Sequence, residues 1–202
     1  FMELLYRAFS KYGTTSYRET KNQDVYRFQT YINLQNFSFL ISSKTGTIPN
    51  WINSNNFFDF LAGFIDSDGS VIIRKSRDYF QYVIRFFGEN LALLLAVKTR
   101  LENLGYNLSI HKSHSKGEAR YHNGIKFVYN EDYYILETFK KSQTIDLLQK
   151  IPIRHPEKIA KKDLIYSIES KGIVHWKKIE KDVKKLRSKI KQSVIKKTCL
   201  LY

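Results

Sequence analysis

The stretch Phe57-Phe-Asp-Phe-Leu-Ala-Gly-Phe-Ile-Asp-Ser-Asp-Gly-Ser70 is an apolar, helix-like run that ends in an acidic turn. Asp68 would lie at the C-terminus of that helix, where the helix dipole is already negative, so a cation beside its carboxylate is favoured. Gly63 and Ser67 share one helical face, and small residues at this spacing let a second helix approach closely. The pattern predicts two such helices side by side, each contributing one carboxylate to a shared metal site. The alternative is a buried helix whose last residues only cap and turn the chain.

The composition indicates a polyanionic partner. The 202 residues include 34 Lys and Arg against 19 Asp and Glu, a net charge of +15, and such a basic chain favours nucleic acid. No apolar run reaches the roughly 18 residues of a membrane-spanning helix. No signal peptide is recognisable, although residue 1 is Phe rather than Met. The single Cys199 excludes an internal disulfide and argues against a cysteine zinc site. These features predict an intracellular nucleic-acid-binding protein, cytoplasmic in an archaeon or bacterium, or organellar.

Hydrophobic periodicity after the motif predicts a mixed fold. Alternation of apolar and polar residues indicates strands, and apolar spacings of three and four indicate helices. The predicted strands are residues 71–77, 79–87, 106–113 and 121–129, and the predicted helices after the motif are residues 90–103 and 132–139. With the motif helix, the order is α-β-β-α-β-β-α. This is an α+β fold in which helices cover one face of a curved antiparallel sheet, a saddle.

Both ends of the chain differ from this central part. The first 45 residues predict helices at residues 4–13 and 37–41 and a strand at residues 25–32. This order resembles that of the second half of the central part and indicates a partial repeat. The alternative is a chance agreement between two ordinary α/β stretches. Past residue 150 the chain is helical and basic. Its apolar stripe consists of Trp176, Ile179, Val183, Leu186 and Ile190. The lysines around that stripe form either a solvated surface or a phosphate-binding one. The predicted parts are a partial first repeat with its linker (1–48), a complete repeat (49–160) and a basic amphipathic segment (161–202).

Residues 61–69, Leu-Ala-Gly-Phe-Ile-Asp-Ser-Asp-Gly, resemble the signature of the LAGLIDADG homing endonucleases, and seven of nine positions are identical. The resemblance implies that family's fold and metal-dependent hydrolysis of phosphodiesters at a long DNA target, with Mg²⁺ or Mn²⁺ as cofactor. It assigns metal binding to the Asp68 side chain and the Ser67 carbonyl, and it makes Asp68 catalytic. It also assigns Ala62 and Gly63 to the seam between two motif helices.

The resemblance extends to residues 151–158, where the family places a basic residue near the attacking water. It makes Lys158 the second catalytic candidate, because a lysine there would stabilise charge on the phosphate. The alternative is an exposed lysine at a helix start. Many family members also carry a polar residue at the end of the second strand, and the matching position here is Gly88 or Glu89. The chain therefore departs from the family pattern at this position.

DNA recognition is expected from the sheet face opposite the helices, because a twisted antiparallel ribbon fits the major groove. Arg and Gln on such a face are suited to bidentate contact with guanine and adenine. The alternation of the strands places these candidates there: Ile72, Arg74, Ser76, Tyr79, Gln81, Arg85, Ser109, His111 and Lys126.

The sequence thus favours a site-specific endonuclease that cuts both strands of DNA, encoded by a mobile element and acting in intron homing. The alternative is a binding protein of the same fold, either an RNA maturase that assists splicing of its intron or a DNA-binding relic that no longer cuts. One motif supplies one acid, so cutting both strands needs a second motif. It would come from a homodimer partner or from an upstream repeat missing here, and the half-repeat in residues 1–45 favours the latter.

Overall fold

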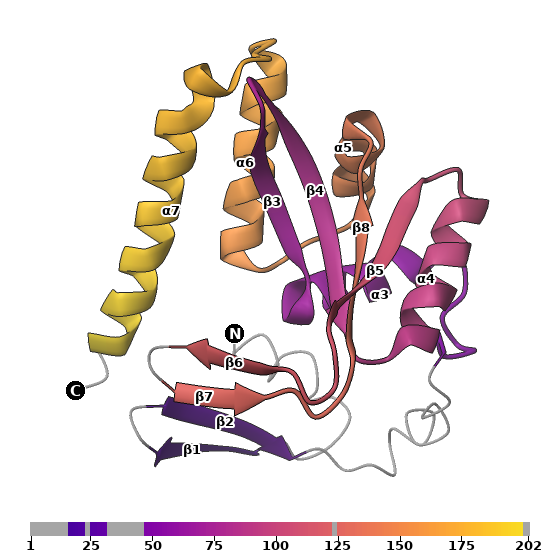
Figure 1. Ribbon diagram of the computed structural model, residues 1–202, viewed down its shortest axis with the longest axis vertical. Helices are drawn as coiled ribbons and strands as arrows, with labels where there is room; N and C mark the ends of the chain where they lie inside the picture. The colour runs from indigo at the N-terminus through magenta and orange to yellow at the C-terminus, as the bar shows by residue number, and fades with distance from the viewer. Residues whose placement is uncertain (1–15, 23–24, 32–46, 123–124, 200–202) are drawn as a thin grey trace. The chain divides into compact units, whose positions relative to one another are not determined.

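The computed structural model describes residues 16–22, 25–31, 47–122 and 125–199. The chain divides into two compact units, residues 1–51 and 52–202. In the first unit, β1 (Ser16–Asn22) and β2 (Val25–Tyr31) pair as an antiparallel hairpin (Figure 1). The strand predicted at residues 25–32 is therefore present as β2. The helices predicted at residues 4–13 and 37–41 lie outside the described residues.

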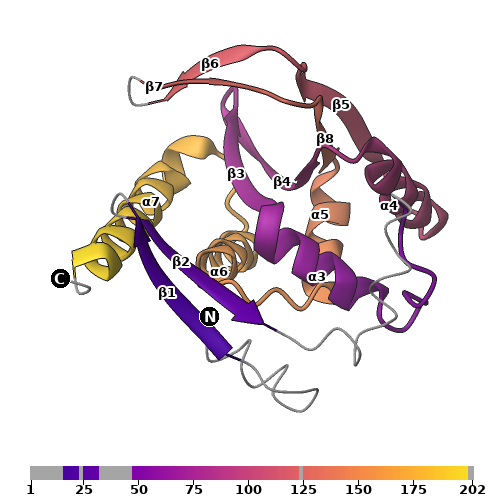
Figure 2. The same cartoon turned by 90° about the horizontal axis from the view of Figure 1, so that it is seen from below.

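The second unit is built on a four-stranded antiparallel sheet. In spatial order its strands are β3 (Ser70–Ser76), β4 (Tyr79–Gly88), β8 (Tyr133–Thr138) and β5 (Leu108–His114). The helices packed on one side of the sheet are α3 (Phe57–Asp68), α4 (Leu91–Asn103), α5 (Lys141–Lys150) and α6 (Pro156–Ser170) (Figure 2). The expected α+β fold, an antiparallel sheet with helices on one face, is confirmed.

Two predicted elements in the second half of the sheet are wrong. The helix expected at residues 132–139 is the strand β8, and the strand expected at residues 121–129 is instead a separate hairpin of β6 (Ala119–His122) and β7 (Ile125–Val128). β8 is flanked by β4 and β5, so both of its edges are paired. Ladder hydrogen bonds on both sides favour the extended conformation over local helix propensity, and the β-branched Ile135 and aromatic Tyr133 and Tyr134 suit it.

The core lies between the sheet and the helices. Leu61 and Ile65 of α3 are fully buried, and the Phe64 ring meets the Phe86 ring of β4 edge-on with centroids 5.5 Å apart. Burying one such large apolar side chain contributes about 1.5–3 kcal/mol. This packing fixes α3 under the middle of the sheet and holds its C-terminal end at the start of β3.

The last helix, α7 (Trp176–Cys199), lies beside the edge strand β3. Its first backbone N–H, that of Trp176, donates to the carbonyl of Asp78 at 2.9 Å, and the Arg187 guanidinium donates to the carbonyl of Ile73 at 3.4 Å. Ile179 and Val183 of the apolar stripe are buried. A helix in this position covers the unpaired edge of the sheet. Among the helices that the structure describes, none is long and apolar enough to cross a membrane.

Candidate metal-binding helix end and recognition face

The motif helix α3 passes directly into β3. The N–H of Gly69 donates to the carbonyls of Phe64 and Ile65, at 3.1 Å each. A Cβ at Gly69 would lie 2.6 Å from the Ile65 Cα and 2.9 Å from the Arg85 carbonyl oxygen, so only glycine fits this close approach. Asp68, the last residue of α3, is therefore held at the junction of helix and sheet, and its side chain is exposed.

Lys158 of α6 reaches the same helix end. Its ammonium group donates to the carbonyl of Ile65 and, at 2.9 Å, to the carbonyl of Asp66, and its side chain is only 8% exposed. These carbonyls belong to the last turn of α3, where the helix dipole favours a cation. Burial lowers the pKa of Lys158 from its ordinary value, while the nearby Asp66, Glu157 and Asp68 carboxylates act in the opposite direction. The two predicted catalytic residues therefore lie at one end of α3.

Asp66 has a positioning role in the same turn. Its carboxylate accepts the backbone N–H groups of Arg154 at 2.8 Å and His155 at 3.1 Å, immediately before α6 begins at Pro156. Arg154 and His155 thereby connect the start of α6 to the end of α3. Asp66 thereby sets the approach of Lys158, and the Asp68 carboxylate also lies near enough to act on the Lys158 pKa. Within the part of the chain that the structure describes, no hydrogen bond or ion pair involves the Asp68 carboxylate.

The small residues of α3 separate into two groups. Ala62 is buried within its own unit, at 4% exposed, whereas Gly63 is exposed and a Cβ built there meets nothing within 4 Å. Ser67 is also exposed, and its hydroxyl donates to the carbonyl of Gly63 at 3.0 Å. Gly63 and Ser67 thus form the open face of α3, together with the exposed Asp59 one turn earlier.

The donors at this helix end are of the kind that divalent metal ions bind. Mg²⁺ prefers oxygen ligands and takes one or two carboxylates, the rest being water and phosphate. Asp68 supplies one such carboxylate, with the backbone carbonyl of Ser67 adjacent in the chain. No group of three or more His, Cys, Asp or Glu side chains that could hold a metal occurs among the described residues. The donors described here therefore do not enclose a metal ion by themselves.

Strand register places the predicted recognition residues on one face of the sheet. Arg74 of β3 lies opposite Gln81 of β4, and Ser76 lies opposite Tyr79. Arg85 of β4 is in register with Glu137 of β8. The face that carries these rows is the one without α3, α5 and α6 (Figure 2). Also on this face by alternation and register are Ile72, Ser109 and His111.

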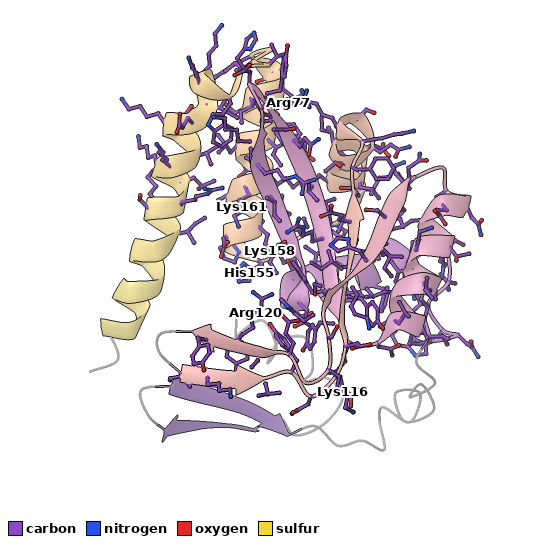
Figure 3. The ribbon with its side chains drawn as sticks, viewed as in Figure 1. Arg77, Lys116, Arg120, His155, Lys158 and Lys161 are labelled. Atoms are coloured by element: carbon purple, nitrogen blue, oxygen red, sulfur yellow. The ribbon has the colours of Figure 1, made fainter. Side chains whose placement is uncertain are left out.

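Lys126 is the candidate that the structure does not bring to this sheet. It lies in β7, is exposed, and pairs across the separate hairpin with Tyr121. Figure 3 labels other basic side chains: Lys158 and Lys161 on α6 with His155 just before it, Arg77 at the turn between β3 and β4, Lys116 before the hairpin and Arg120 in β6. Lys126 therefore belongs to a second region, at the far end of the β5–β8 ribbon.

Residues 58–151 match the family model of the LAGLIDADG-like domain. This part of the chain is a LAGLIDADG-like domain. The match begins within α3 and ends just after α5, so it includes the motif helix and the whole four-stranded sheet. The family expected from residues 61–69 is confirmed.

Several solved structures resemble the chain at low sequence identity. One is of mesophilic variants of the homing endonuclease I-DmoI, 17% identical, covering 74% of this chain and 68% of that chain with a TM-score of 0.45. Another is the LAGLIDADG homing endonuclease I-GzeII in complex with its DNA target, 14% identical, covering 85% and 77% with a TM-score of 0.45. The homing endonuclease I-CvuI in complex with DNA is 20% identical, covering 56% and 66% with a TM-score of 0.35. No curated protein matches the chain in sequence.

Glu137 lies on the predicted recognition face of the sheet, although the sequence pattern did not place it there. Its carboxylate accepts from the Arg85 Nε at 2.6 Å and lies 3.7 Å from a terminal nitrogen of Arg74. The helix predicted at residues 132–139 placed Glu137 outside the sheet. A strand at residues 133–138 would have placed it on the polar face, because Ile135 and Glu137 alternate with the buried Leu136 and Thr138.

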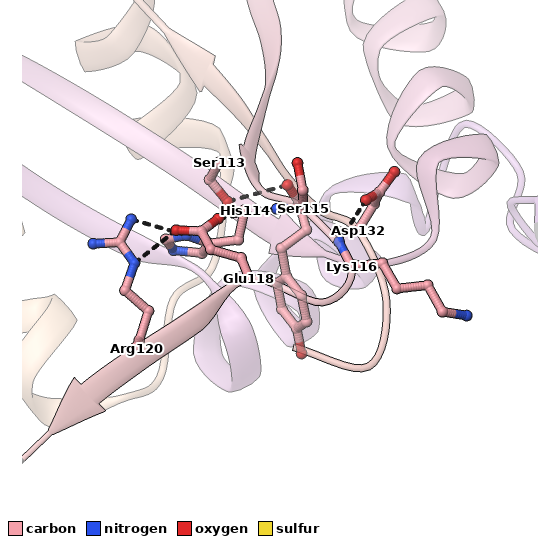
Figure 4. A network of polar contacts seen from close by, with 8 residues as sticks. Ser113, His114, Ser115, Lys116, Glu118, Arg120 and Asp132 are labelled. Carbon is pink, nitrogen blue, oxygen red and sulfur yellow. Dashed lines mark hydrogen bonds and ion pairs between the residues drawn. The ribbon is translucent and has the colours of Figure 1, made fainter. Parts of the chain in front are cut away.

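A polar network stiffens the bend between the sheet and the β6–β7 hairpin of the domain (Figure 4). The Glu118 carboxylate accepts the Ser115 N–H at 3.1 Å and the Arg120 Nε at 2.8 Å, and these bonds, the backbone one first, lower its pKa. The Asp132 carboxylate accepts from the Lys112 ammonium at 2.6 Å, which lowers the Asp132 pKa. Both carboxylates stay charged at neutral pH, so the hairpin remains connected to the sheet by charge-assisted bonds.

The end of β4 is the position where the family pattern has a polar residue. Gly88 is the last residue of β4, opposite Tyr134, and Glu89 follows it with an exposed side chain. Gly88 carries no side chain that could order a water. Glu89 is the polar group available at this strand end.

Proposed function

We propose that the chain is a site-specific, divalent-metal-dependent DNA endonuclease of the LAGLIDADG homing type. The observation that carries this proposal is the junction of α3 and β3. There the exposed carboxylate of Asp68 and the buried ammonium group of Lys158 share one helix end, at the margin of a sheet face lined by Arg and Gln. A phosphate laid across that face would reach both groups.

Asp68 and Lys158 would have different roles in the reaction. Asp68 would hold a divalent cation, with the Ser67 carbonyl beside it, and the cation when bound would supply charge stabilisation and a lowered pKa for water. Lys158 uses two of its three ammonium hydrogens on the carbonyls of Ile65 and Asp66, which leaves one to face the phosphate. Because that ammonium group is buried, its charge acts in a low dielectric and strengthens the attraction.

The complete nuclease needs a second motif helix on the open face of α3. Gly63 supports this requirement, since space around its Cα on the described unit is open and would admit a close helix. The second helix would come from another copy of the chain or from an upstream repeat. It would bring the second acid that a cut in both strands requires.

The second candidate function is a binding protein of the same fold, an RNA maturase or a DNA-binding relic. Two observations favour it: the described residues include no group of three or more side chains that could hold a metal, and Gly88 stands where the family pattern has a polar residue. Its recognition face would be the same.

The test compares the wild type with Asp68→Asn on a randomised DNA library with Mg²⁺. The proposal expects the wild type to enrich and cut particular sequences, and the variant to bind them without cutting. Glu102→Gln is the matched control, because Glu102 is an exposed acid on a different helix, α4, where it is ion-paired with Lys98. Binding without cutting by the wild type would favour the second candidate. Undiminished cutting by Asp68→Asn would refute the assigned role of Asp68.

A further inference from the structure

A carboxylate lies buried in the middle of a surface that otherwise suits DNA. Glu137 occupies the central strand β8, in register with Arg85 on one side and Ser109 on the other. It is 8% exposed. A carboxylate loses hydration at such a position and needs charged partners to remain there. Its contacts therefore indicate what it does.

Glu137 contacts two arginines at once. One carboxylate oxygen accepts from the Arg85 Nε at 2.6 Å, and the other lies 3.7 Å from the Arg74 Nη2. The Arg74 Nε in turn donates to the Gln81 side-chain oxygen at 3.0 Å. Each guanidinium is therefore anchored through its Nε, and most of its terminal N–H groups remain available on the open face.

Anchoring of this kind has a consequence for recognition. A guanidinium reads guanine through two parallel hydrogen bonds, and the geometry of that pair is demanding. An arginine already held by its Nε loses less side-chain entropy when it binds. The Glu137 charge also opposes the attraction of both arginines to phosphate, which is the sequence-independent part of DNA affinity. Both effects increase discrimination between sequences more than they increase affinity.

Given the proposed function, on which this role rests, we propose that Glu137 is the positioning residue that sets base specificity at the centre of the recognition face. It holds Arg74 and Arg85 ready for two guanines in the target. Loss of Glu137 removes the partner of the Arg85 Nε and the carboxylate beside Arg74, whose Nε Gln81 still holds. A change at either arginine affects one base position.

The experiment selects binding sites from a randomised duplex library with the full chain, under conditions that prevent cutting. The variants are Glu137→Gln, Arg85→Lys and Arg74→Lys, with Glu102→Gln as the control. Glu102 is an exposed glutamate of α4 that is ion-paired with Lys98, away from the recognition face. Each arginine variant should lose the guanine preference at a different single position. Glu137→Gln should lose about tenfold in preference at the Arg85 position and less at the Arg74 position, where Gln81 still holds the guanidinium. Its affinity for random DNA should stay equal or rise.

The outcomes separate this role from the proposed function. A wild type that enriches no sequence refutes both. A wild type that enriches a site, with Glu137→Gln giving the same profile, refutes only the role of Glu137. If Glu137→Gln does not fold, the comparison of the wild type with the arginine variants still decides. A wild type that prefers guanine at neither the Arg74 position nor the Arg85 position would refute the role. Glu137 is proposed to act through Arg85 at that base position. The double variant Glu137→Gln, Arg85→Lys should therefore be as selective there as Arg85→Lys alone.

Discussion

At the scale of single residues, the end of α3 combines three different requirements within a few positions. Gly69 lets the chain pass from helix to strand without a collision, Asp68 places an exposed carboxylate at that junction, and Lys158 donates hydrogen bonds to carbonyls of the last turn. Each requirement has a separate physical origin, so substitutions should separate them experimentally.

Gly69→Ala should destabilise the protein by about 3 kcal/mol. Its Cβ would fall 2.6 Å and 2.9 Å from backbone atoms of Ile65 and Arg85, which cannot move aside as a flexible side chain would. Urea denaturation gives the loss. Gly63→Ala is the control, since its Cβ meets open space on the described unit and alanine gains up to about 1 kcal/mol in a helix. Equal losses in the two variants would contradict the assigned close approach at Gly69.

Lys158 should make stability depend on alkaline pH in a definite direction. Burial lowers its pKa below the ordinary 10.5, which the unfolded chain keeps. Between the lowered value and 10.5 the unfolded state binds more protons, so the stability of the wild type should rise with pH through this window. The cost of burying the charge is fully present below the folded pKa. The free energy of unfolding of the wild type minus that of Lys158→Met should therefore increase from neutral pH toward 10.5. A difference that decreases over this range would contradict the direction assigned here.

At the scale of elements, α7 combines packing with charge. Trp176, Ile179 and Val183 are buried on one side of the helix, while the lysines at positions 177, 178, 181, 184, 185 and 189 are exposed. The helix also lies beside β3, the strand at the edge of the recognition face. An exposed cationic helix at this edge is well placed for DNA phosphates that run past the sheet.

Replacement of Lys178, Lys181 and Lys185 by Ser should weaken DNA binding and reduce its dependence on salt. These three exposed lysines share one side of α7. The slope of log affinity against log salt falls by about 0.9 for each phosphate that the variant no longer neutralises. Fluorescence anisotropy over a salt series gives the slope. Lys98→Ser is the control on α4, where Lys98 is ion-paired with Glu102. An unchanged slope would mean that α7 is only solvated.

At the scale of the whole molecule, the fold and the proposed chemistry depend on different forces. The second unit folds around apolar side chains that pack between sheet and helices, such as Leu61, Phe86 and Leu136. The charges collect at its surface, on the recognition face, at the bend of the hairpin and along α7. The proposed chemistry depends on a divalent cation and on a second motif.

Chelation of divalent ions should therefore stop cutting and leave the fold intact. The melting temperature in EDTA should equal that in Mg²⁺. A ligand raises the melting temperature only when it occupies a site that is formed in the native state and absent from the unfolded state. The described residues include no closed group of three metal-binding side chains. Differential scanning calorimetry and a DNA-binding assay in EDTA provide the two measurements. A large fall in melting temperature on chelation would show that the fold itself needs the metal.

The sequence by itself determined the features that depend on local pattern. The apolar run with its acidic end predicted α3 and the position of Asp68, and alternation predicted β3, β4 and the face on which Arg74, Gln81 and Arg85 lie. The lysine in residues 151–158 came from the family resemblance, and the structure places it at the end of α3.

Only the tertiary structure decided the features that depend on distant neighbours. Residues 133–138 became a strand because β4 and β5 lie on either side, and that pairing carries Glu137 to the centre of the recognition face. The Arg85 carbonyl adds a distant neighbour to the local crowding by Ile65 that requires glycine at 69, and Lys158 is buried because α6 meets the end of α3. Residues far apart in the chain make these contacts, and side-chain packing and paired hydrogen bonds there outweigh the local preferences that a sequence pattern reports.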